Sequence, residues 1–93
     1  MNIDELAQKL EKMFNSGENK NAMTQLFMII YYDEITRLCQ KEFYSINSFC
    51  MTLQEKAHLS GKTYYIELKK GYKLAKYVKV RTEYINHWLI RYW

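Results

Sequence analysis

The sequence predicts an α+β fold in which three helical segments are followed by a basic β-hairpin. Apolar residues recur every three to four positions before Gly61, and alternate with polar residues after it. The charge divides at nearly the same place. Residues 1–55 carry five basic and eight acidic side chains (net −3), whereas residues 56–93 carry nine basic and two acidic ones (net +7). A chain of 93 residues is expected to form a single small domain.

The first helix is expected over residues 3–16, where five apolar side chains fall on one stripe. They are Ile3, Leu6, Leu10, Met13 and Phe14. Asn2 can cap this helix, and the helix dipole favours the acidic residues Asp4 and Glu5 in its first turn. Gly17 suits the left-handed position that ends a helix. Together these signals predict both ends of the segment.

Residues 22–44 are expected to form one long helix, or two helices with a bend, and to be the most buried part of the fold. Asn21 is a plausible cap. The third helical segment spans residues 49–59. Thr52 and Glu55 match a capping box at its start, and Ser48 is a competing start.

The hairpin is expected over residues 61–83, because Tyr64, Ile66 and Leu68 alternate with polar neighbours and Val78 and Val80 do the same. A turn at Lys70-Gly71-Tyr72 would join the two strands. Residues 84–93 have apolar groups on both faces. They fit either a short helix or a third strand.

The solvated face of this hairpin, with its turn and flanks, is the candidate nucleic-acid site. Phosphates need cations that can reach them, and unpaired bases need flat rings on which to stack. The candidate residues are Lys62, Tyr65, Lys69, Lys70, Tyr72, Lys73, Lys76, Tyr77, Lys79 and Arg81. A simpler interpretation is that lysines keep an edge strand soluble and that tyrosines are there as good strand formers.

In layout, three helices followed by a hairpin resembles a winged helix-turn-helix domain. That resemblance implies a third helix that reads the major groove and a wing that contacts the DNA backbone or the minor groove. On the third segment, Gln54 could read adenine and Lys56 could meet a phosphate, but Glu55 would repel phosphates. Backbone or single-strand contact through the wing is therefore favoured over base reading.

These patterns predict a small, non-catalytic, cytoplasmic accessory protein that binds single- or double-stranded DNA in preference to RNA. We expect it to serve a larger replication, recombination or regulatory enzyme of a virus or mobile element. No cofactor or metal is expected, because His58 and His87 do not have zinc-ligand spacing relative to Cys39 and Cys50, which are expected to be buried thiols. The longest apolar run, residues 26–32, is too short to cross a membrane.

The alternative is a protein–protein interaction module or inhibitor whose lysines only solubilise it. The last ten residues are rich in aromatic side chains, and such a patch marks an interface if it is not folded into the core. The candidate partner-binding residues are Trp88, Arg91, Tyr92 and Trp93. The partner would be a larger protein or a second copy of the chain.

Overall fold

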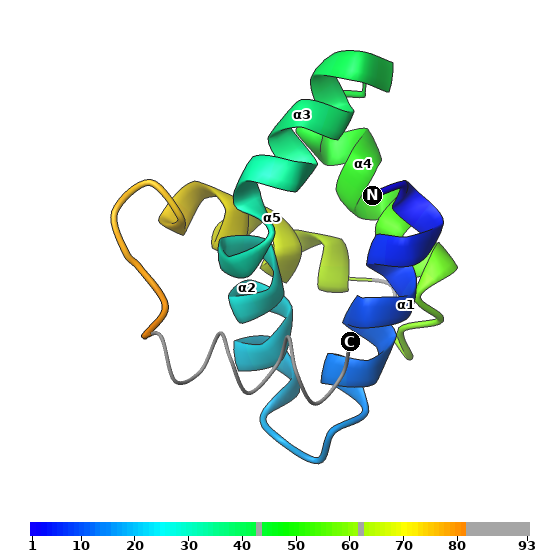
Figure 1. Cartoon of the computed structure of the whole chain (residues 1–93). Helices are drawn as coiled ribbons and strands as arrows, with labels where there is room; N and C mark the ends of the chain where they lie inside the picture. Colours follow the sequence, from blue (N-terminus) through cyan, green and yellow to red (C-terminus); the bar gives the residue numbers. More distant parts are fainter. Residues whose placement is uncertain (43, 62, 82–93) are drawn as a thin grey trace.

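The protein is all-helical in the part of the chain that the computed structural model describes, which is residues 1–42, 44–61 and 63–81. Figure 1 shows the arrangement. The helices are α1 (Ile3–Phe14), α2 (Lys20–Ile30), α3 (Tyr32–Glu42), α4 (Ile46–Lys56) and α5 (Tyr64–Leu74). These residues contain no β-strand, so the predicted α+β fold with its hairpin and wing is wrong.

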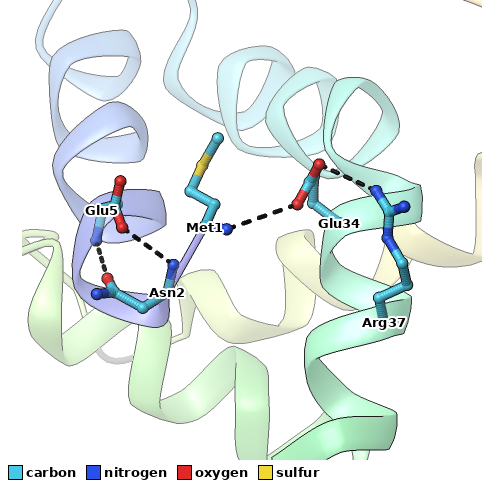
Figure 2. Close-up of polar contacts among 5 residues, drawn as sticks. All are labelled: Met1, Asn2, Glu5, Glu34 and Arg37. Carbon is cyan, nitrogen blue, oxygen red and sulfur yellow. Dashed lines mark hydrogen bonds and ion pairs between the residues drawn. The ribbon is translucent and has the colours of Figure 1, made fainter.

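The first helix begins where the sequence predicts and ends at Phe14, two residues before the predicted end. The Asn2 side chain accepts a hydrogen bond from the Glu5 backbone N–H at 2.9 Å, and the Glu5 carboxylate accepts one from the Asn2 N–H at 3.3 Å (Figure 2). This reciprocal pair is a capping box. Gly17, with φ of 92°, takes the left-handed conformation just after the helix.

The predicted bend in the second segment occurs at Tyr31, between α2 and α3. The N–H of Tyr31 donates to the Phe27 carbonyl, and the carbonyl of Tyr31 accepts from the Ile35 N–H, so hydrogen bonding continues through the bend. The cap at the start of α2 is Asn19 instead of the expected Asn21. Its side chain accepts from the Ala22 N–H at 2.9 Å.

The fourth helix begins earlier than the capping-box pattern predicts. Ser45 is the N-cap, and its hydroxyl accepts from the Ser48 N–H at 3.1 Å. Thr52 lies inside α4, so the capping box predicted there is wrong. The early start is favoured because Phe49 and Leu53 are then one helical turn apart, and both are fully buried.

The fifth helix occupies the place of the first predicted strand and its turn. Leu68 and Gly71 are buried and one turn apart, so the apolar spacing satisfies a helix as well as a strand. Gly71 is not a hairpin turn. A Cβ there would lie 2.6 Å from the Gln25 carbonyl oxygen, which shows how closely α5 approaches α2. Tertiary packing against α2 therefore overrides the strand tendency of the tyrosines.

The buried side chains of α1, α2, α4 and α5 join in one apolar cluster, with Ile35 and Cys39 contributed by α3. Phe27 and Phe49 are its largest fully buried members. Figure 1 shows α5 lying across α2, with residues 75–81 at the edge of the molecule, on the far side of α2 from α1. The α5 helix thus carries the chain from the core to the surface.

Charged groups connect the N-terminal end of α1 to α3. The Met1 amino group lies 3.9 Å from one oxygen of the Glu34 carboxylate, and the Arg37 guanidinium lies 3.0 Å from the other (Figure 2). The Glu34 carboxylate thus forms ion pairs with two groups of the protein itself. Glu34 is partly exposed and Arg37 is exposed, and ion pairs of this kind add little to stability.

Candidate nucleic-acid interface

The cations predicted to bind nucleic acid gather at the C-terminal half of α5 and in the chain that follows it. We call residues 69–81 the basic segment. It contains six basic and no acidic residues. The six are Lys69, Lys70, Lys73, Lys76, Lys79 and Arg81. Residues 75–77 form a turn and residues 78–81 have no regular structure, so the cations lie on a helix end and its extension instead of on a wing.

Contacts with α2 hold the basic segment in place. Besides the close approach at Gly71, the Gln25 amide donates to the Glu67 carboxylate at 2.7 Å, and Lys70 donates to the other carboxylate oxygen at 3.2 Å. These two hydrogen bonds, from Gln25 first and then from Lys70, lower the pKa of Glu67. The one acidic residue of α5 therefore favours its ionised form, and both of its carboxylate oxygens already accept hydrogen bonds from the protein.

The six cations differ in their exposure and in whether they have a partner among the described residues. Lys69 is half-buried and donates to the Asn47 side chain at 2.9 Å, and Lys70 pairs with Glu67. The other four are exposed: Lys73, Lys76, Lys79 and Arg81. No carboxylate within the described ranges forms an ion pair with any of these four. They are the charges available to an external anion.

The three candidate tyrosines are also divided by the fold. Tyr65 packs against the core cluster, and the ring of Tyr72 stacks on Tyr32 with centroids 4.7 Å apart. The Tyr72 hydroxyl shares a hydrogen bond with Thr36 at 2.7 Å, and burial raises its pKa. Tyr77, in contrast, is 82% exposed. Only Tyr77 has a ring face open to a ligand among these three.

Gln54, expected to read adenine, and Lys56, expected to meet a phosphate, both make contacts with other residues of the protein. The Gln54 side chain accepts a hydrogen bond from the Tyr65 N–H at 2.7 Å, and Lys56 pairs with Asp4 at 2.8 Å. The hydrogen bond to Asp4 raises the pKa of Lys56. Neither side chain is placed as the winged-domain resemblance implied. Sequence spacing could not reveal this, because Lys56 and Asp4 are far apart in the chain.

The α4 and α5 helices contact each other and are joined by residues 57–63. His58 has a positive φ of 56° in this connection, and its ring lies 3.3 Å from the Glu11 carboxylate. The start of α5 is packed inward, with Tyr64 edge-on to Phe14 at 4.8 Å. The N-terminal end of α5 is therefore partly covered.

A groove that sequence reasoning missed lies between α2 and the end of the basic segment. It has a volume of about 420 Å³ and is lined mainly by apolar groups, including Leu26, Ile29, Val78 and Val80. The two valines were expected in the second strand of the hairpin. The sequence signal for the groove is the apolar character of these two valines, which pair in the structure with the apolar residues Leu26 and Ile29 of α2.

The two cysteines are free and buried, as predicted. Burial, then the nearby Cys39, raises the pKa of the Cys50 thiol to about 12, with Lys69 acting weakly in the opposite direction. Within the described ranges, no group of three or more His, Cys, Asp or Glu side chains is placed to hold a metal ion. Among the same residues, no helix has the length and apolar character needed to cross a membrane.

Several predicted residues lie outside the described ranges. They are Lys62, His87 and the candidate partner-binding residues Trp88, Arg91, Tyr92 and Trp93. The predicted short helix or third strand over residues 84–93 also falls there.

Comparison with known proteins and protein families places the chain in a family. No curated protein and no solved structure matches the chain significantly. The sequence profile of a family described as an HTH-like domain matches residues 2–81. This match covers all five helices and most of the chain. The chain therefore belongs to the HTH-like domain family.

Proposed function

We propose that the protein is a non-catalytic DNA-binding protein that grips the sugar–phosphate backbone with its basic segment. The observation that carries the proposal is the group of four exposed cations without carboxylate partners in the described part of the chain: Lys73, Lys76, Lys79 and Arg81. Membership of an HTH-like family supports DNA over RNA, because helix–turn–helix domains commonly bind DNA.

Backbone contact is favoured over base reading for a structural reason. The N-terminal end of α5 is packed through Tyr64 and carries the acidic Glu67, whereas the cations begin only at its second half. Phosphate contacts position a protein on DNA without specifying sequence. We therefore expect affinity that depends strongly on salt and weakly on base sequence.

The salt dependence can be stated in advance. Four phosphate contacts on B-DNA give a slope of log K against log salt of about −3.6. A fourfold increase in salt, from about 50 to 200 mM, should then weaken binding about 150-fold. A much shallower slope would mean that the cations do not meet phosphates.

The decisive experiment uses matched charge reversals and fluorescence anisotropy with a labelled 20-base-pair duplex. The Lys73→Glu/Lys76→Glu variant should bind at least about tenfold more weakly at 50 mM salt, with a slope reduced by about 2. The control is Lys12→Glu/Lys41→Glu, which makes the same charge change at exposed lysines in the last turns of α1 and α3.

The control should lose much less affinity than the test variant, because its charges lie outside the basic segment. Equal losses in the two variants would assign binding to net charge alone and contradict the proposed interface. An undetectable affinity of the wild-type protein at 50 mM salt would overturn the proposed function. Service to a larger replication, recombination or regulatory enzyme stays a prediction.

A further inference from the structure

We infer that Tyr77 is a stacking platform for one unpaired base, so that single-stranded DNA gains a contact that duplex DNA does not. This inference rests on the proposed function and names the class of nucleic acid favoured at the same site. Its starting point is the exposure of the Tyr77 side chain, which is 82% accessible, the largest fraction among the exposed large hydrophobic side chains of the described residues.

Among the described residues, nothing in the packing explains why a tyrosine stands at position 77. Its strand-forming tendency is irrelevant, because residues 75–77 form a turn just after α5. Packing is equally irrelevant, because no aromatic ring within the described ranges contacts it. The backbone at this point is nevertheless fixed, since the Tyr77 N–H donates to the Leu74 carbonyl at 2.9 Å. The ring is thus presented outward from a defined turn.

The surroundings of Tyr77 suit a nucleotide. Lys73 and Lys76 precede it and Lys79 and Arg81 follow it, all exposed. An aromatic ring with cations on both sides in the chain can stack on a base while the cations hold the phosphates that flank that base. The ring is sequence-tolerant, since every base has a flat face.

The same geometry discriminates between single and double strands. Bases within a duplex already stack on each other, so their faces are closed to an external ring. The four cations can reach phosphates of either form. Loss of the Tyr77 ring should therefore weaken single-strand binding, by about 5- to 150-fold for one stacked base, and leave duplex binding nearly unchanged.

The test measures the dissociation constants of the full chain for a 20-nucleotide oligothymidylate and for a 20-base-pair duplex at the same salt concentration. Tyr77→Ala should weaken oligothymidylate binding about tenfold or more and change duplex binding less than about twofold. Tyr77→Phe should bind like the wild type, because the ring and not the hydroxyl makes the contact. Ile66→Ala, which trims an exposed apolar side chain of α5 outside the basic segment, is the control and should change neither.

Circular dichroism of each variant checks that the helices are retained, which is expected at so exposed a position. Equal effects of Tyr77→Ala on the two ligands, or no effect on either, would overturn the stacking inference while duplex binding by the wild type still supports the proposed function. Absence of wild-type binding to both ligands would overturn both. A Tyr77→Phe variant as weak as Tyr77→Ala would also contradict stacking.

Discussion

The α4 and α5 helices are both 11 residues long and lie next to each other, yet they use their cations in different ways. Lys56, in the last turn of α4, pairs with Asp4 of α1 at 2.8 Å. Lys73, in the last turn of α5, is exposed and has no carboxylate partner in the described part of the chain. The comparison teaches that a cation becomes available to a ligand only when the fold brings no acid to it.

The largest effect is expected from Gly71→Ala, which removes the support that places α5 on α2. The added Cβ would lie 2.6 Å from the Gln25 carbonyl oxygen, and backbone cannot move aside as a flexible side chain can. Overpacking of this kind costs about 3 kcal/mol. Urea unfolding followed by circular dichroism should show the loss as a lower midpoint.

The control for this variant is Gly61→Ala, whose added Cβ meets only the ring of Tyr64, at 3.0 Å. A side chain can shift by the few tenths of an ångström required, so the loss of stability should be smaller. If Gly71→Ala proves as stable as the wild type, the close contact between α2 and α5 is not what positions the basic segment.

Smaller changes in melting temperature and DNA affinity should distinguish Lys56 from Lys73. Lys56→Glu breaks the pair with Asp4 and should lower the melting temperature slightly, with duplex affinity reduced only by the general change in charge. Lys73→Glu should do the reverse, with little change in melting temperature and a larger loss of affinity. Both variants change the net charge equally, so each is the control for the other. Identical affinities of the two variants would break the distinction between a paired and an available cation.

The smallest expected effect is on the pH dependence of stability and concerns Glu67, the acidic residue of α5 that accepts hydrogen bonds from Gln25 and Lys70. Its pKa is lowered by the hydrogen bonds from Gln25 and Lys70, so the stabilisation is fully present above the unfolded value near pH 4.5. It is lost as the pH falls further, through the folded pKa. Wild type should therefore lose about 0.5 kcal/mol more than Glu67→Gln between pH 5 and pH 3. Parallel urea midpoints of the two proteins over this range would contradict the prediction.

The helices before Gly61 could be predicted from the sequence, because their apolar stripes repeat over several turns and local capping residues mark their ends. Asn2 and Gly17 act as expected. The start of α4 was missed because the Thr52–Glu55 pattern is a local signal, whereas burial of Phe49 and Leu53 requires an earlier start. Where a cap competes with core packing, packing decides.

The α5 helix was missed because its apolar residues are compatible with two periods. Leu68 and Gly71 are buried on one face of α5, where Gly71 closely approaches Gln25 of α2, and nothing local distinguishes glycine at a helix contact from glycine in a turn. Whether the candidate residues bind nucleic acid stays a prediction. The four available cations and Tyr77 were all among the candidates, since charge and aromatic content can be counted from composition. Tyr65 and Tyr72 could not be told apart from Tyr77 without the fold.

The sequence by itself determined how charge is distributed along the chain, with an acidic first part and a cluster of cations in residues 69–81. It also determined the helical first two thirds, because periodicity and capping act over a few residues. Only the tertiary structure decided that the cations extend from a helix, that Lys56 is paired, and that Tyr77 alone of three tyrosines is exposed. The physical reason is that availability depends on neighbours from distant parts of the chain, such as Asp4 for Lys56 and Thr36 for Tyr72.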